Sequence, residues 1–181
     1  MQLRWAHIVI YVRDTKKMVD FYTDVLGFEV TDRGPIGPEG REREIVFLSQ
    51  VDTDHHQVAF INARKGEEPP NSVDHIAFRT ADINDVREMI SKLSGRKDVS
   101  GISPITHGNA WSVYFRDPEN NGVEVFTDTP WHVAQPQGQA WDPALDDEAL
   151  IKATKAQFGA EPEFGPIEAF YERRAAELKN R

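Results

Sequence analysis

Hydrophobic and polar positions alternate along residues 5–13, as expected for a β-strand with one buried face. A helical pattern follows, for which Asp14 or Thr15 can provide the N-cap oxygen. Gly27 is placed to end this helix, because glycine readily adopts the left-handed conformation found after helix C-termini. The apolar positions of the predicted helix recur at helical spacing: Met18, Val19, Phe21, Tyr22, Val25 and Leu26.

Three further strands are predicted after Gly27, over residues 28–31, 44–48 and 56–61. The segment 34–40 is rich in glycine and proline and is expected to form a loop. The first part of the chain therefore predicts the order β-α-β-β-β.

The same order returns after a linker over residues 66–71. Residues 75–78 predict a strand, and Asp82 can cap a helix whose apolar positions are Val86, Met89, Ile90 and Leu93. Further strands are expected near residues 102–105, 112–115 and 122–126. Repetition of a whole pattern predicts two β-α-β-β-β modules, an α+β fold whose curved sheets pair into one incomplete β-barrel.

Each module begins with a histidine at the start of its first strand, His7 in one and His75 in the other. In both modules an aspartate follows the histidine by seven residues, as Asp14 and Asp82. The repeat therefore places an imidazole at the same point of each module.

The chain from about residue 129 lies outside the repeat. An extended arm, a helix that starts at Asp146 or Asp147 and ends at Gly159, and a last helix from Pro166 are expected. The apolar stripe of that last helix is expected to pack against the body or a second subunit, with a substrate lid as the alternative. The stripe consists of Ile167, Phe170, Tyr171 and Leu178.

Composition narrows the possible functions. The 181 residues carry a formal net charge of −9 and no basic cluster, which argues against nucleic-acid and anionic-membrane partners. Cysteine is absent, which excludes disulfides, thiolate zinc sites and cysteine nucleophiles. We found no signal peptide and no stretch of membrane-spanning length, so the expected location is the cytoplasm.

A metal site is the predicted chemistry of His7, His75 and Glu124. A lone histidine at a strand start is usually structural, but two histidines at matching positions of the two modules favour a metal-binding role. Glu124 is flanked by Val123 and Val125, and a buried carboxylate is costly unless it is paired or bound to metal. Two imidazoles and one carboxylate suit a divalent iron with open coordination positions.

The whole pattern over roughly residues 5–130 resembles the vicinal oxygen chelate superfamily, which includes glyoxalases, extradiol dioxygenases and fosfomycin or bleomycin resistance proteins. The segment Phe21-Tyr22-Thr23-Asp24-Val25-Leu26-Gly27-Phe28 is similar to the helix-to-strand corner of that superfamily. Within it, the chain is most similar to small one-domain extradiol catechol dioxygenases, whose iron ligands correspond to His7, His75 and Glu124.

The resemblance also implies three residues that act on the substrate. His56, in the segment Asp54-His55-His56-Gln57, matches the pocket histidine that serves as acid and base. Tyr114 precedes Glu124 by ten residues, as the hydrogen-bonding tyrosine of those enzymes precedes its carboxylate ligand. His107 is a third catalytic candidate, although its interval to Tyr114 is shorter than in larger relatives. If residues 55 and 56 lie on a strand, their side chains face opposite sides, and His55 is then the solvent-facing one.

One position departs from the family pattern. Asn120 stands where glycine or proline is usual after Asp117-Pro118-Glu119, and asparagine tolerates the left-handed conformation that such a turn needs.

The resemblance implies an extradiol ring-cleaving dioxygenase that uses Fe(II), or Mn(II) as a lesser possibility. Its substrates would be dioxygen and a catechol-type diol, as for biphenyl-2,3-diol 1,2-dioxygenases or catechol 2,3-dioxygenases. A glyoxalase-like isomerase or lyase is one alternative, but that class usually has a second acidic ligand where this chain has Gln57. A non-catalytic drug-binding protein is the other, and it typically lacks the metal trio.

The predicted organisation is a first module over residues 1–65, a second over 71–128, and a C-terminal arm with helices over 129–181. Members of the superfamily often dimerise, so a homodimer is expected.

Overall fold

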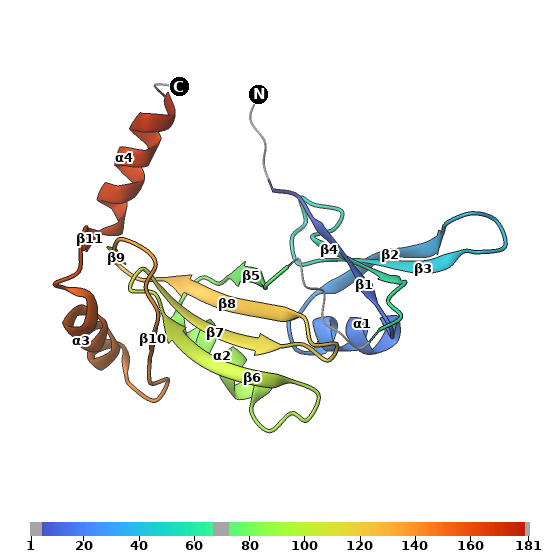
Figure 1. Ribbon diagram of the computed structural model, residues 1–181, viewed down its shortest axis with the longest axis horizontal. Helices are drawn as coiled ribbons and strands as arrows, with labels where there is room; N and C mark the ends of the chain where they lie inside the picture. The colour runs from blue at the N-terminus through green and yellow to red at the C-terminus, as the bar shows by residue number, and fades with distance from the viewer. Residues whose placement is uncertain (1–4, 67–72, 180–181) are drawn as a thin grey trace. The chain divides into compact units, whose positions relative to one another are not determined.

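The computed structural model describes residues 5–66 and 73–179 (Figure 1). Its contacts divide the chain into two units. The first unit comprises the chain up to Ser72 together with the short segment Asp117–Asn121, and the second comprises the remaining residues from Val73 onward. The predicted linker over residues 66–71 lies almost wholly outside the described residues.

The first unit is one β-α-β-β-β module. Its elements are β1 (Ile8–Val12), α1 (Thr15–Asp24), β2 (Glu29–Ile36), β3 (Arg43–Ser49) and β4 (Val58–Asn62). They form a four-stranded sheet in the order β1-β4-β3-β2, in which β1 runs parallel to β4 and the other pairs are antiparallel. The core lies between this sheet and α1, where Met18, Phe21 and Tyr22 are almost completely buried.

The ends of α1 follow from its sequence. The Asp14 side chain accepts a hydrogen bond from the backbone N–H of Lys17, which confirms the predicted N-cap. Gly27 has a φ of 78°, the left-handed conformation expected of a residue that follows a helix.

One expectation in this module was wrong. The Gly- and Pro-rich segment over residues 34–40 is not all loop, because β2 continues through Gly34 and Pro35 to Ile36, opposite β3. Proline is tolerated there because β2 is an edge strand, so the missing N–H breaks no inner ladder. The resulting β2–β3 hairpin projects from its unit (Figure 1).

The second unit repeats the topology. Its elements are β5 (Ile76–Arg79), α2 (Ile83–Leu93), β6 (Ser100–Thr106), β7 (Ala110–Arg116) and β8 (Gly122–Asp128). The short strand β10 (Gln139–Ala140) extends the sheet to the order β10-β6-β7-β8-β5, with β5 parallel to β8. The α+β class and the repeated module are thereby confirmed.

The C-terminal extension adds two helices to the second unit. They are α3 (Asp147–Phe158), capped by the Asp146 side chain, and α4 (Ile167–Lys179). A ribbon of β9 (Trp131–His132) and β11 (Gly165–Pro166), which the sequence pattern did not indicate, leads into α4.

The apolar stripe of α4 packs against the body only at its beginning. Ile167 and Phe170 are half-buried, and the Phe170 ring stacks on His132 with the ring centroids 3.8 Å apart. Tyr171 and Leu178 are 46% and 57% exposed, and α4 extends away from the β9–β11 ribbon (Figure 1). The stripe thus packs against the body only at its beginning, and packing of its exposed part against a second subunit stays a prediction.

No helix in the described ranges is long and apolar enough to cross a membrane.

Candidate functional site

Glu124 is the centre of a polar cluster on the sheet of the second unit. It lies in the middle of β8, directly opposite Tyr114 of β7, and it is only 7% exposed. His75 immediately precedes β5, the parallel neighbour of β8, and its Nε2 atom lies 3.2 Å from Oε2 of Glu124. Strand pairing thus brings together residues that are about 50 positions apart in the chain.

A glycine allows this close approach. At Gly122, where β8 begins, a Cβ atom would lie 2.1 Å from the carbonyl oxygen of Asp74 and 3.0 Å from the Cβ of His75. Any larger residue would push the start of β5 away from β8. Gly122 therefore helps to hold His75 beside Glu124.

The His75 ring is oriented by its neighbour in the chain. Its Nδ1 atom lies 2.6 Å from Oδ1 of Asp74, and this hydrogen bond lowers the pKa of the Asp74 carboxyl. A carboxylate can only accept, so Nδ1 donates the proton of this hydrogen bond, and Nε2, the ring nitrogen beside Glu124, is the one that would bind a metal. A carboxylate behind the imidazole is also the arrangement that orients metal-binding histidines.

His107 and Tyr114 form the other side of this cluster. The Tyr114 hydroxyl lies 2.8 Å from Nε2 of His107, while Nδ1 of His107 lies 2.5 Å from the carbonyl oxygen of Gln137. A carbonyl accepts only, so the His107 Nδ1–H donates to it and Nε2 accepts from the tyrosine. His107 Nε2 is also 3.9 Å from Oε1 of Glu124.

Burial, followed by the nearby Glu124 carboxylate, raises the pKa of the Tyr114 phenol. The phenol therefore keeps its proton at neutral pH and remains a hydrogen-bond donor.

The C-terminal arm positions His107, a role that the sequence pattern did not indicate. Besides the Gln137 carbonyl, the Gln135 side-chain amide donates to the His107 carbonyl oxygen at 2.9 Å. A polar arm that follows a repeat carries no periodic signal for such contacts, so only tertiary structure could show them.

His7 and His56 meet in the first unit. Their ring centroids are 4.3 Å apart, and the His56 ring also contacts Phe47 edge-on at 4.8 Å. Partial burial, followed by the neighbouring His7 and His55, lowers the pKa of His56. His56 is therefore neutral at neutral pH and able to accept a proton.

The expected opposition of His55 and His56 across a strand was wrong, because both precede β4, which begins at Val58. Their Nδ1 atoms lie 3.0 Å apart, so the two rings are neighbours. The His55 side chain is 59% exposed, in keeping with its predicted solvent-facing position.

The six predicted site residues thus form two groups, one in each unit. His7 and His56 belong to the first unit, and His75, His107, Tyr114 and Glu124 belong to the second. Neither unit, within residues 5–66 and 73–179, gathers by itself three His, Asp or Glu side chains able to hold an ion. A shared metal site at His7, His75 and Glu124 stays a prediction.

The donor set nevertheless fits a divalent metal. The nearly buried Glu124 carboxylate lies beside the Nε2 atoms of His75 and His107, and imidazole nitrogens are common metal ligands. A carboxylate in this state gains most from a cation nearby, and imidazole with carboxylate suits Fe(II), Mn(II) and related ions.

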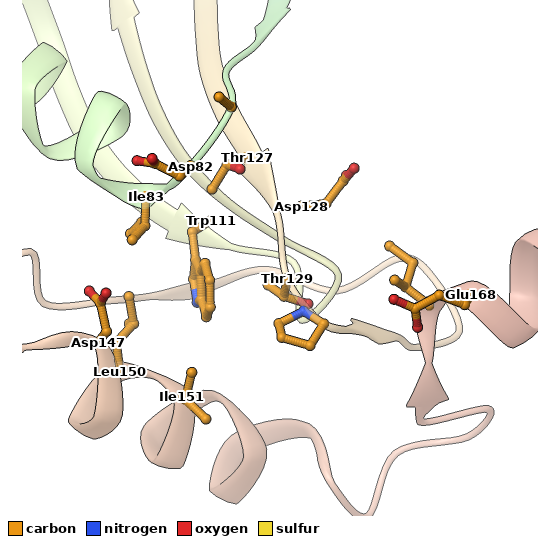
Figure 2. A pocket seen from close by; sticks show the side chains of 13 residues that line it. Asp82, Ile83, Trp111, Thr127, Asp128, Thr129, Asp147, Leu150, Ile151 and Glu168 are labelled. Carbon is orange, nitrogen blue, oxygen red and sulfur yellow. The ribbon is translucent and has the colours of Figure 1, made fainter.

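A separate hollow of about 470 Å³ lies in the second unit, where α3 and α4 face the ends of β7 and β8 (Figure 2). Trp111 extends from the sheet toward Leu150 and Ile151 of α3 and donates its indole N–H to Thr154 at 2.9 Å. The lining of this hollow includes none of the six predicted site residues.

The chain matches the family model described as the Glyoxalase/Bleomycin resistance protein/Dioxygenase superfamily over residues 4–125. It is 27% identical over 168 residues to biphenyl-2,3-diol 1,2-dioxygenase 2 of Rhodococcus globerulus, covering 83% of both chains. It is 32% identical over 130 residues to biphenyl-2,3-diol 1,2-dioxygenase 3 of the same organism, covering 69% of this chain and 63% of the relative. A manganese-dependent 2,3-dihydroxybiphenyl 1,2-dioxygenase of Geobacillus genomosp. 3 is 27% identical, and this chain spans 36% of its length.

Solved structures share the fold. A glyoxylase/bleomycin resistance protein/dioxygenase domain from Frankia sp. EAN1pec superposes with a TM-score of 0.59 at 17% identity, covering 71% of this chain and all of that domain. The fosfomycin resistance protein FosX from Listeria monocytogenes gives a TM-score of 0.53 at 19% identity, covering 71% of this chain and 95% of that protein.

Proposed function

Because the chain belongs to the glyoxalase/bleomycin resistance protein/dioxygenase superfamily, we propose that it is an extradiol dioxygenase that opens the ring of a catechol-type diol with dioxygen at a divalent metal. The observation that carries the proposal is the cluster of His75, Glu124, Tyr114 and His107 on one sheet. It combines donors for a metal with a protonated phenol held in place by a second imidazole.

In this proposal His7, His75 and Glu124 would hold the metal, either Fe(II) or Mn(II). Three protein donors leave positions open for other ligands. When bound, the metal would hold the diol and dioxygen together, lower the pKa of the diol hydroxyls and pass electrons between the two substrates.

His56 would accept the proton of a diol hydroxyl and later return it as the ring opens. The lowered pKa of His56 favours the first role, because the ring is neutral before the diol arrives.

Tyr114 would donate a hydrogen bond to a substrate oxygen, on which negative charge develops as the ring opens. His107 would keep the phenol aimed by accepting its hydrogen bond between turnovers. Both oxygen atoms of dioxygen would enter the product, a ring-opened hydroxymuconate-type compound.

The isomerase alternative would need an acidic metal ligand at the position of Gln57. The Gln57 side-chain oxygen accepts the backbone N–H of Gln50 at 2.9 Å and so secures the segment before β4. An amide engaged in this way is a poor substitute for an acidic metal ligand.

The decisive experiment is an aerobic assay of protein reconstituted anaerobically with Fe(II) or, separately, with Mn(II). Each preparation is offered a panel of catechols, and both oxygen consumption and the visible absorbance of a yellow product are followed. We expect one mole of oxygen consumed per mole of diol. Protein that retains metal but consumes no oxygen across the panel would contradict the proposal and favour the isomerase.

A further inference from the structure

The face of the sheet that carries Glu124 also carries a positively charged side chain. Alternate residues of a strand face the same side, so Phe126 and Asp128 of β8 share the face of Glu124. Val123 and Val125 lie on the other face, which is almost completely buried beneath α2.

Strand pairing adds Arg79 to the same face as Glu124. In the parallel register of β5 with β8, Ala77 pairs with Glu124 and Arg79 pairs with Phe126. Both β5 residues are exposed. Arg79 is therefore the next residue outward from the cluster along this face.

The Arg79 guanidinium is held in a defined position. Its central carbon lies 5.1 Å from the centroid of the Phe126 ring, a cation–π distance, and its Nη1 atom donates to Asp128 at 2.7 Å. Its side chain remains 56% exposed. The bond to Asp128 uses one of five N–H donors, and the planar fork is suited to bind a second carboxylate.

The spacing of this face matches a substituted aromatic diol. Neighbouring strands lie about 4.8 Å apart and two residues along a strand span about 6.6 Å, so the Cα atoms of Glu124 and Arg79 are separated by roughly 8 Å. A diol with its oxygens beside Glu124 and its ring lying along this face would direct a ring substituent toward Arg79.

We infer that Arg79 recognises an anionic substituent, so that catechols bearing a carboxylate on the ring or on a short side chain are the preferred substrate class. This inference rests on the proposed dioxygenase function. Phe126, whose ring packs against the guanidinium, would hold Arg79 in place, and Arg79 would provide the charge that selects the acid over neutral catechols.

The test compares each acid with its own methyl ester: 3,4-dihydroxybenzoate and 3,4-dihydroxyphenylacetate against their methyl esters. The metal-loaded wild type is expected to have a kcat/KM about tenfold or more higher for the acids. Arg79→Gln should remove most of that ratio, and Arg79→Lys should restore part of it because a point charge remains. Calorimetric titration without oxygen should likewise give a lower Kd for each acid than for its methyl ester.

Arg96→Gln is the matched control, because Arg96 also pairs with an aspartate, Asp98, but on the loop after α2. Its acid-to-ester ratio should equal that of the wild type. Equal kcat/KM values for acid and ester in the wild type, or a ratio that Arg79→Gln leaves unchanged, would overturn the inference while ester turnover still supports the dioxygenase. If the metal-loaded wild type turns over neither acids nor esters nor unsubstituted catechol, the proposed function fails and this inference falls with it.

Discussion

Oε1 of Glu119 accepts a hydrogen bond from the backbone N–H of Asp14 at 2.7 Å, although the two residues are 105 positions apart. The same oxygen accepts the N–H of Arg13 at 2.7 Å. The Arg64 guanidinium donates to the Glu119 carbonyl oxygen at 2.9 Å and lies 3.6 Å from its carboxylate. The turn after β7 is thereby joined to the start of α1, within the first unit.

This buried contact predicts a large loss of stability for Glu119→Gln. The carboxylate is 2% exposed and the Arg64 side chain 8% exposed, so the substitution removes a buried negative charge 3.6 Å from this guanidinium and beside the N–H groups of Arg13 and Asp14. We expect the free energy of unfolding to fall by about 3 kcal/mol, measured by urea denaturation followed by circular dichroism. Glu172→Gln, on the exposed part of α4, should change it by less than about 0.5 kcal/mol. Equal losses in the two variants would show that the contact contributes nothing specific.

The buried carboxyl of Asp117, in the same turn, should make the free energy of unfolding depend on pH. Burial is the main cause that raises the pKa of its carboxyl above the ordinary value of 3.8, and the hydrogen bonds from Asn121 offset this in part. The folded state therefore holds this proton to a higher pH than the unfolded state. The stabilisation is fully present below the ordinary pKa and is lost as the pH rises through the raised folded value.

The measurement is the difference in unfolding free energy between the wild type and Asp117→Asn, from urea titrations at a series of pH values. That difference should shift in favour of the wild type as the pH is lowered from 7 toward 4. A difference that is constant with pH would contradict the raised pKa.

The 3.2 Å separation of His75 and Glu124 leads to a prediction about metal content. Protein reconstituted anaerobically with Fe(II) and passed through a desalting column should retain about one iron per chain, measured by elemental analysis. His75→Ala and Glu124→Ala should each abolish retention because each removes a ligand. His132→Ala, in the β9–β11 ribbon, should retain the metal. Full iron content in either ligand variant would remove the metal-site hypothesis.

His56 is expected to affect turnover without affecting metal binding. Its ring packs against His7 and Phe47, and it is the proposed acid and base. His56→Gln should retain iron but lower kcat by a factor on the order of a hundred, measured as oxygen uptake with saturating catechol. His55→Gln tests whether the effect is specific, since the His55 side chain is mostly exposed. A His56→Gln enzyme as fast as the wild type would show that another group transfers the proton.

Much of the second-unit cluster follows from local sequence rules. Alternation defines β7 and β8, and their short turn sets the register that places Tyr114 opposite Glu124. Asn120 in that turn has a φ of 67°, the left-handed conformation that its side chain was expected to tolerate. The histidine that precedes the first strand of each module is also visible in the sequence, because strand starts and helix caps are short-range features.

Contacts between distant segments were decided only by the tertiary structure. The sequence pattern marks residues 117–121 as a turn, but it does not show that this turn belongs to the first unit and that Glu119 binds the N–H groups before α1. Nor does it show that the Gln137 carbonyl fixes the proton of His107. Periodicity reports which face of an element is buried, whereas the partner of a polar group depends on which distant backbone arrives beside it. The sequence by itself therefore determined the repeated modules and the residues that carry the proposed chemistry, and the tertiary structure decided how those residues are oriented and what holds them.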